Sequence, residues 1–221
     1  MAYYALDPKS VYPHLPAKTE LDLWNGTCYV SLVGFMFLNT RIKGIAIPWH
    51  VNFEEVNLRF YVRYRDGSEW KRGVVFIKEI VPKAMLTFVA NTVYGEHYET
   101  MPMQHEWRSD GDRLSVGYRW QKTRWHSLNV VAENRLQDIV DGSEEEFITE
   151  HYWGYTKLNR GTSEYQVEHP RWQVYPTVSA EVDVDFGALY GEEFTFLANE
   201  KPKSVFLAEG SAIKVNAGMK I

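Results

Sequence analysis

The stretch VNLRFYVR, Val56–Arg63, decides the fold class, because apolar and polar residues alternate strictly along it. A period of two places alternate side chains on opposite faces of a β-strand. Similar alternation recurs in four later segments, Leu114–Gln121, Trp125–Ala132, Thr162–His169 and Val178–Val184. We therefore predict a mainly β protein.

A second stretch, GVVFIKEIV (Gly73–Val81), is apolar on both faces and predicts a strand that is covered on both sides. Lys78 and Glu79 interrupt it and point to opposite sides, so at least one of them is expected to be buried. A buried charge needs a partner or becomes neutral. Arg59, on the polar face of the preceding strand, is the expected partner of Glu79, either as a structural ion pair or within a pocket.

After Pro82 the apolar period changes to that of a helix. Met85, Phe88, Val89 and Val93 fall on one stripe, and Gly95 is a typical stop signal, so we predict a helix packed on the sheet between Pro82 and Gly95.

Two further helices are expected. Ser143 and Glu146 form a capping box, which predicts a short helix over Glu144–Tyr152. A third helical turn is expected within Phe186–Phe196. The order of elements predicts one domain over residues 1–221, a closed antiparallel β-barrel or cone with a few peripheral helices.

Composition excludes several classes of protein. The 221 residues carry a net charge of −5, and Lys and Arg are scattered, which argues against a nucleic-acid surface. The single cysteine, Cys28, cannot form an internal disulfide. The longest apolar run, Tyr29–Leu38, is too short to span a membrane, and the early Asp7 and Lys9 do not suit a secretory signal. We expect a cytoplasmic protein with neither a nucleic-acid nor a membrane partner.

Histidines and aromatic residues leave two alternatives each. His97, His105 and His151 could assemble into a metal site, but no ligand spacing is present, so surface or hydrogen-bonded histidines are expected, with no metal and no cofactor. The run from His151 to Tyr155 could line a cavity mouth or form an ordinary core edge. Glu54 and Glu55 are expected to be solvated at a strand start.

Five segments, taken together, carry a resemblance to a known family. They are Val30–Val62, Arg72–Met85, Glu146–Thr156, Val167–Trp172 and Lys201–Val215, and they resemble the uncharacterised YqjF-like family. That family is placed in the acetoacetate-decarboxylase-like superfamily, and the resemblance implies a closed antiparallel β-barrel or cone with a central cavity. It implies no particular reaction.

The resemblance only partly carries over the lysine chemistry of acetoacetate decarboxylases. These enzymes form a Schiff base on a lysine whose pKa is lowered by burial or by a neighbouring cation. Lys83 matches their Pro-Lys step, but Ala84 stands where they have a second lysine, and Ser31 where they have a glutamate. The strand that carries a substrate-facing arginine in that family is not expected here.

The sequence predicts a protein that binds a small anionic or carbonyl-bearing molecule inside the β-cone. Arg59 is expected to hold the anion, Asn57 to donate a hydrogen bond, and Glu79 to act as a general base or as the partner of Arg59. Lys78 is a second catalytic candidate, and two further ligand-binding candidates are His151 and Tyr155. The alternatives are a Schiff-base lyase and a non-catalytic scaffold with a filled core.

Overall fold

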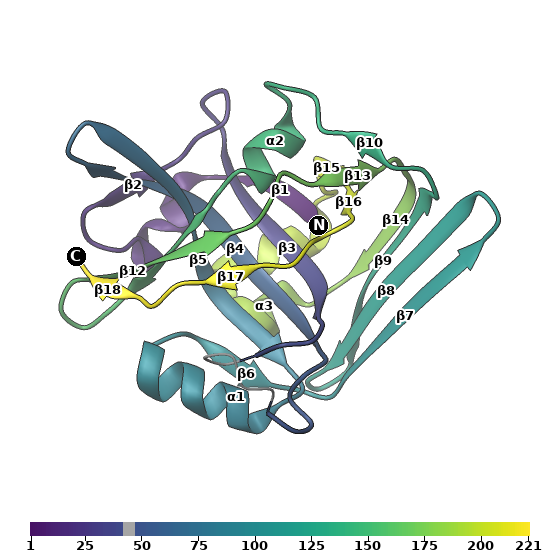
Figure 1. The fold of residues 1–221 in the computed structure, drawn as a ribbon, viewed down its shortest axis with the longest axis horizontal. Helices are drawn as coiled ribbons and strands as arrows, with labels where there is room; N and C mark the ends of the chain where they lie inside the picture. Colours follow the sequence, from purple (N-terminus) through teal and green to yellow (C-terminus); the bar gives the residue numbers. More distant parts are fainter. Residues whose placement is uncertain (42–46) are drawn as a thin grey trace.

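A computed structural model describes residues 1–41 and 47–221, and the side chains of Val93 and Tyr94 are not among those described. The largest sheet of this part of the chain runs in the order β15-β1-β3-β4-β5-β11-β12-β17, with β2, β6 and β18 attached to β4, β5 and β12 (Figure 1). Its strands are β1 (Ala2–Leu6), β2 (Thr19–Leu21), β3 (Cys28–Phe37), β4 (Phe53–Asp66), β5 (Glu69–Val81), β6 (Tyr98–Thr100), β11 (Trp153–Lys157), β12 (Thr162–Glu168), β15 (Ser204–Val205), β17 (Lys214–Val215) and β18 (Met219–Lys220).

Two smaller sheets complete the β structure of the described residues. The order β14-β9-β8-β7 forms a four-stranded sheet, and β10-β13-β16 a three-stranded one. Their strands are β7 (Met103–Asp110), β8 (Arg113–Gln121), β9 (Trp125–Glu133), β10 (Gln137–Asp138), β13 (Gln173–Tyr175), β14 (Thr177–Asp183) and β16 (Leu207–Ala208). The predicted strands are therefore all present, and the protein is mainly β as expected.

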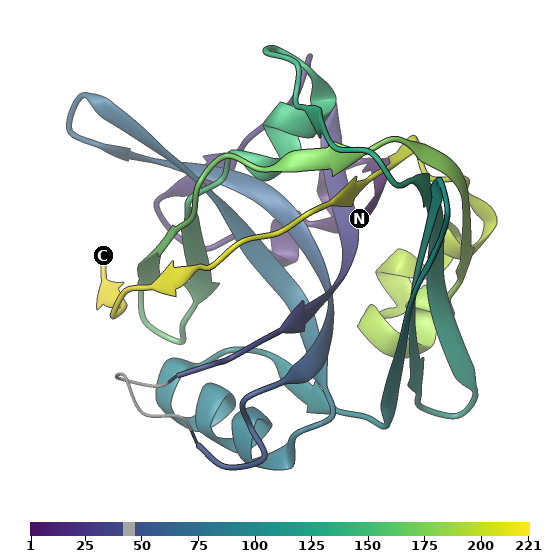
Figure 2. The same cartoon turned by 45° about the vertical axis from the view of Figure 1, so that its right-hand side comes forward.

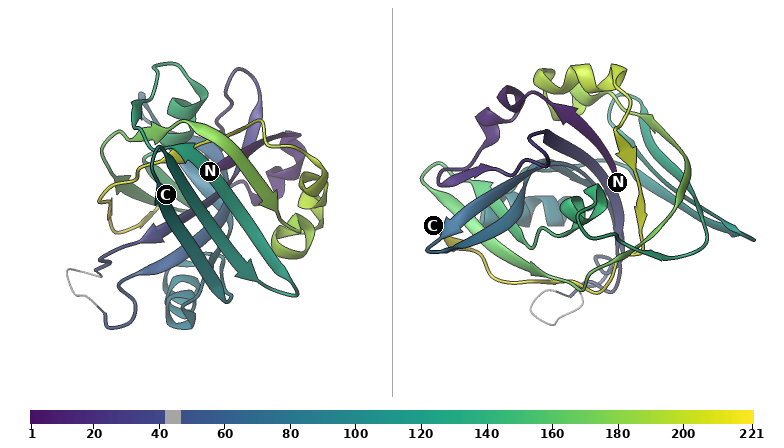
Figure 3. Two further views of the ribbon diagram at one scale, coloured as in Figure 1. Left: turned by 90° about the vertical axis from the view of Figure 1, so that its right-hand side faces the viewer. Right: turned by 90° about the horizontal axis from the view of Figure 1, so that it is seen from above.

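The prediction of a closed antiparallel barrel or cone is wrong. The large sheet is open, because its two ends, β15 and β17, pair with β1 and β12 and not with each other. It is also mixed, since β5 pairs in parallel with both β6 and β11. Figures 2 and 3 show this sheet curling strongly, with α2 across one end and the four-stranded sheet standing beside it. The alternation in single strands set the strand faces, whereas closure depends on pairings between distant segments.

The helices are short and lie outside or across the end of the curled sheet. They are the 3₁₀ turns η1 (Pro8–Ser10) and η2 (Tyr12–His14), then α1 (Ala84–Val89), the π-turn η3 (Ala90–Tyr94), α2 (Glu144–Thr149), α3 (Phe186–Tyr190) and the 3₁₀ helix η4 (Glu192–Asn199). No helix of the described residues is both long and apolar enough to cross a membrane.

The helix predicted between Pro82 and Gly95 is confirmed as α1 and η3, and Gly95 ends it with a left-handed φ of 69°. Two residues of its predicted apolar stripe are not buried, since Met85 and Phe88 are 60% and 64% exposed, and the side chain of Val93 lies outside the described residues. The helix is instead attached to the following β6 segment by polar groups: Thr87 Oγ1 lies 2.7 Å from the hydroxyl of Thr100, and Asn91 bonds to the backbone of Tyr98 in both directions.

The capping box at the start of α2 is confirmed, because the hydroxyl of Ser143 accepts a hydrogen bond from the backbone N–H of Glu146 at 3.2 Å. The carboxylate of Glu146 accepts from the N–H of Gly142, one residue before the cap, at 2.6 Å. This short helix ends at Thr149, and the chain then enters β11.

The two faces of β4 belong to two different cores. Val56, Leu58 and Phe60 pack into the larger apolar core, whereas Tyr61 packs on the other face with Tyr3 and Phe147. The register of β4 against β5 shifts after Leu58, which faces Lys78, so that Arg59 faces Phe76 and Ile77 has no partner of its own. This bulge turns both Glu79 and Phe76 toward the face that carries Arg59.

Candidate functional site

Three polar side chains of β4 gather on the inner face of the curled sheet. Glu55, Asn57 and Arg59 are two residues apart, so the strand places them on one side. Glu55 and Asn57 are 2% and 1% exposed, and Arg59 is half-buried. Glu79 of β5 lies directly opposite Asn57 and is 4% exposed. The two longest strands thus bring an arginine, an amide and two carboxyl groups together.

Glu55 is held by two donors. The amide nitrogen of Asn57 donates to Oε1 of Glu55 at 3.0 Å, and the hydroxyl of Tyr98 donates to Oε2 at 3.3 Å. The backbone of Tyr98 pairs in register with Glu79 across β5 and β6. Among the described atoms, Oδ1 of Asn57 and Oε2 of Glu79 are buried without a hydrogen-bond partner. A buried polar atom left in this state costs about 1–3 kcal/mol, so the arrangement suits an additional group that would complete it.

The carboxyl groups of this cluster resist ionisation. Burial, followed by the nearby carboxylates of Glu55 and Glu96, raises the pKa of Glu79 well above its usual value. Burial also raises the pKa of Glu55 to about 7, although its hydrogen bonds and Arg59 oppose the change. Both shifts favour the neutral carboxyl, and a neutral carboxyl can donate a hydrogen bond.

Arg59 occupies the middle of the site. Its Nη2 lies 3.8 Å from the sulfur of Met1, and its Nε has no hydrogen-bond partner within residues 1–41 and 47–221. Its positive charge opposes the rise that burial causes in the pKa of Glu55, and it adds to the fall that burial causes in the pKa of His151. A half-buried guanidinium with a spare donor is suited to a carboxylate or another planar anion.

His151 forms a carboxylate–histidine pair at the other side of Arg59. Oδ2 of Asp22 accepts from Nε2 of His151 at 3.1 Å and from Nε of Arg72 at 2.6 Å. Burial lowers the pKa of His151 to about 4 against the pull of Asp22, so the ring is neutral at pH 7. Because Nε2 carries the proton that Asp22 accepts, Nδ1 presents a lone pair, and this atom is buried without a partner in the described part of the chain.

The structure thus brings together four residues singled out from the sequence: Asn57, Arg59, Glu79 and His151. Two of the expected roles change. The amide nitrogen of Asn57 is already committed to Glu55, so its free atom is an acceptor. The expected Arg59–Glu79 ion pair is absent from the ion pairs of the described residues, because the bulge sets Arg59 opposite Phe76 and leaves Glu79 beside other carboxyls.

The other two candidates lie elsewhere. Lys78 projects from the opposite face of β5, where its ammonium group pairs with Glu99 at 2.6 Å. Tyr155 is 1% exposed, but its hydroxyl donates to Glu164 at 3.1 Å, and Glu164 also pairs with Lys71. Neither residue contributes to the group around Arg59.

Four contributors were missed by the sequence reasoning. Glu55 was expected in solvent, yet it is buried, and its parity with Asn57 and Arg59 was the available signal. Asp22, Tyr98 and Tyr165 come from distant segments and had no local signal. The buried hydroxyl of Tyr165 has a pKa well above its usual value, first from burial and then from the carboxylates of Glu96, Glu79 and Glu55. A Cβ at Gly154 would collide with the Tyr165 ring, so β11 requires glycine there.

The histidines do not converge. His105 lies 2.7 Å from Glu54 through Nδ1, and His151 lies beside Asp22. Within the residues that the structure describes, no set of three or more His, Cys, Asp and Glu side chains is arranged to hold a metal ion.

Comparisons with known proteins show which family the sequence belongs to. A family model described as an uncharacterized conserved protein, DUF2071, matches residues 1–212. The uncharacterized protein YqjF of Bacillus subtilis is 25% identical over 186 residues, which are 83% of this chain and 74% of YqjF.

Solved structures share the fold at low identity. The enduracididine biosynthesis enzyme MppR with HEPES buffer bound has a TM-score of 0.67 at 12% identity, covering 100% of this chain and 84% of that chain. MppR complexed with pyruvate has a TM-score of 0.63, also at 12% identity, covering 99% and 86%. Acetoacetate decarboxylase from Legionella pneumophila has a TM-score of 0.60 at 11% identity, covering 100% and 82%. The chain therefore belongs to the DUF2071 family, is related to YqjF, and has a fold like that of acetoacetate decarboxylase.

Proposed function

We propose that the protein binds a small molecule that carries a carboxylate and a carbonyl group between Arg59 and Glu79. The carboxylate pairs with the guanidinium of Arg59, whose Nε has no hydrogen-bond partner within the described residues. The carbonyl oxygen accepts a hydrogen bond from the protonated carboxyl of Glu79, and Oδ1 of Asn57 accepts from any hydroxyl or enol that the ligand carries.

The observation that supports this proposal is the set of unpartnered buried atoms around Arg59: Asn57 Oδ1, Arg59 Nε, Glu79 Oε2 and His151 Nδ1. A scaffold with a filled core would satisfy its buried polar groups internally. A ligand of this class supplies both a charged acceptor and a neutral acceptor. MppR, which shares the fold, has been solved in complex with pyruvate, a molecule with these two groups.

The protonation states also favour such a ligand. Three carboxyl groups near one arginine would repel an anion if all were ionised. Because the pKa values of Glu55, Glu79 and Glu96 are all raised by burial, the cluster carries less negative charge at neutral pH than its composition suggests. The neutral His151 can take a proton from the ligand, so proton exchange at a carbon next to the carbonyl is the chemistry that the site could add to binding.

Calorimetry with pyruvate tests the proposal. We expect saturable binding to the wild type that is at least tenfold weaker with lactate, which lacks the carbonyl, and with acetone, which lacks the carboxylate. Arg59→Met should weaken pyruvate binding at least tenfold, with partial recovery in Arg59→Lys. The matched control is Arg108→Met, because Arg108 is exposed on β7, and it should bind as the wild type does.

Glu79→Gln separates the proposed hydrogen bond from the charge. The glutamine amide keeps a donor, so pyruvate binding should persist. Pyruvate binding to the wild type should weaken at alkaline pH as Glu79 ionises, and this weakening should be absent from Glu79→Gln. The proposal would be contradicted if the wild type did not bind pyruvate, or if Arg59→Met bound pyruvate as tightly as the wild type does. Native mass spectrometry of protein purified from its source, with no carboxylate-bearing molecule retained, would favour the scaffold.

The Schiff-base alternative has a separate test. Lys78 lies on the opposite face of β5, paired with Glu99, and Lys83 occupies the position just before α1, outside the cluster. We therefore expect no change in protein mass after incubation with acetoacetate and borohydride, and no release of carbon dioxide above background. A mass increase on either lysine would restore the decarboxylase interpretation.

A further inference from the structure

A cavity of about 450 Å³ lies on the side of the large sheet that faces away from Arg59. Consecutive residues of β1 point to opposite faces, so Tyr3 packs in the core next to the candidate site while Tyr4 packs in the larger core and lines this cavity. The cavity is therefore separated from the candidate site by the sheet itself. Its volume is within the range of small-molecule sites.

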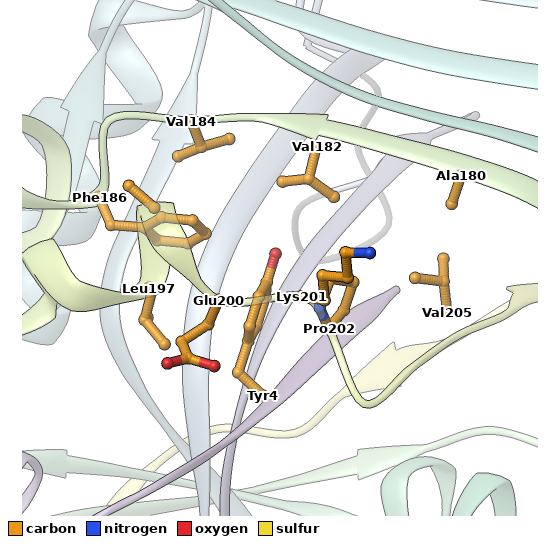
Figure 4. Close-up of a pocket in the computed structure, with 11 residues that line it drawn as sticks. Tyr4, Ala180, Val182, Val184, Phe186, Leu197, Glu200, Lys201, Pro202 and Val205 are labelled. Carbon is orange, nitrogen blue, oxygen red and sulfur yellow. The ribbon is translucent and has the colours of Figure 1, made fainter.

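Most of the residues that line the cavity are apolar. Val182 of β14, Phe186 of α3 and Leu197 of η4 surround it, and Phe186 and Leu197 are 1% exposed. The ring of Tyr4 packs edge-on against Phe186, with 5.6 Å between the ring centroids. Figure 4 shows these side chains converging from the strand and the two helices. Such walls suit a hydrocarbon body.

Two polar groups at the cavity have no partner. Tyr4 is 2% exposed, and its hydroxyl points into the cavity (Figure 4). In the described part of the chain, neither this hydroxyl nor the ammonium group of Lys201 has a hydrogen bond or ion pair. The other charged lining residue is Glu200, whose carboxylate points away from the Lys201 ammonium in Figure 4. A cation and a hydroxyl donor beside a group of apolar side chains are complementary to a single carboxylate on an apolar chain.

We propose that this cavity is a second ligand site, which binds a medium-chain monocarboxylate. The hydrocarbon chain lies against Val182, Phe186 and Leu197. The carboxylate lies at the mouth, where it pairs with Lys201 and accepts a hydrogen bond from Tyr4. This site is independent of the one around Arg59, because the two lie on opposite faces of the large sheet.

Octanoate, titrated by calorimetry into the full chain, is the probe. We expect saturable binding, and at least tenfold weaker binding of octanol and octylamine, which keep the chain but lose the negative charge. Lys201→Met should weaken octanoate binding at least tenfold. Tyr4→Phe, which removes one hydroxyl and keeps the ring in place, should weaken it about threefold to tenfold.

Two control variants make the result specific. Lys203→Met removes an exposed lysine two residues away that does not line the cavity, and it should bind octanoate as the wild type does. Arg59→Met should also leave octanoate binding unchanged, which separates this site from the pyruvate site. Octanol binding as tightly as octanoate, or equal octanoate affinity in Lys201→Met and the wild type, would overturn the proposal.

Discussion

Two buried glutamates of this protein have opposite surroundings. Glu164 on β12 is 1% exposed, and each of its oxygens has a donor: Lys71 at 3.0 Å and Tyr155 at 3.1 Å. Glu79 on β5 is 4% exposed, has one oxygen without a partner, and lies beside other carboxyls. The two glutamates are similarly buried, but Glu164 has a hydrogen-bond donor at each oxygen, whereas Glu79 has an oxygen without a donor. Burial of a charged residue marks a candidate site only when its hydrogen bonds are left open.

The largest effect is expected at the satisfied glutamate. Glu164→Leu removes the acceptor of both Lys71 and Tyr155, and the unpaired groups should lower the free energy of unfolding by about 2–4 kcal/mol. Lys71 keeps Asp66 at 2.7 Å, which limits the loss. Urea denaturation measures the change. A loss below about 1 kcal/mol would show that the pair is not structural.

The pH dependence of stability should reflect the unsatisfied cluster. The pKa of Glu55 is raised from 4.5 to about 7 in the folded state. Its contribution is fully present below pH 4.5 and is lost as the pH rises through about 7, so the wild type should lose about 2–3 kcal/mol relative to Glu55→Gln across this interval.

The wild type must be compared with Glu55→Gln because His151 changes the free energy of unfolding with pH in the opposite direction. Its pKa is lowered to about 4, so its contribution is present above pH 6.5 and is lost as the pH falls through 4. Urea denaturation of both proteins at several pH values gives the difference. A constant gap between Glu55→Gln and the wild type from pH 4.5 to 7 would mean that Glu55 titrates normally.

Glu79→Gln should have a smaller effect, of the opposite sign to Glu164→Leu. At pH 8 the amide removes the cost of a carboxyl whose ionisation is opposed by burial and by Glu55, so the variant should be more stable by about 1–2 kcal/mol. Thermal and urea unfolding at pH 8 both measure this change. Clear destabilisation by Glu79→Gln would indicate that the ionised carboxylate has a partner, and the contrast with Glu164 would fail.

The smallest effect is expected at Tyr98. Its hydroxyl donates to Glu55 over 3.3 Å, a long hydrogen bond, so Tyr98→Phe should cost about 0.5–1 kcal/mol. Losing a donor to the ionised form should also move the Glu55 titration to higher pH. NMR titration of the Glu55 carboxyl carbon detects the shift. An unchanged titration would remove Tyr98 from the site.

Strands and caps follow from the sequence alone because their causes are local. The alternation in Val56–Arg63 and the capping box at Ser143 depend on neighbours within a few residues, and both are present in the structure. The alternation also predicts that Asn57 and Arg59 lie on one face of β4. The same alternation, continued toward Phe53, places Glu55 on that face.

The tertiary structure decided whether the sheet closes, which residues pair across neighbouring strands, and how Asp22 and His151 join the site. The bulge after Leu58 changes which residue of β5 meets Arg59, and a shift of one residue alters the partner of every side chain beyond it. The exposed apolar residues of α1 also could not be predicted from the sequence, because an apolar stripe on a helix is buried only if a neighbouring element covers it. His151 meets Asp22, 129 residues earlier in the chain, through contacts that no local pattern encodes, because they form only when distant strands pack together.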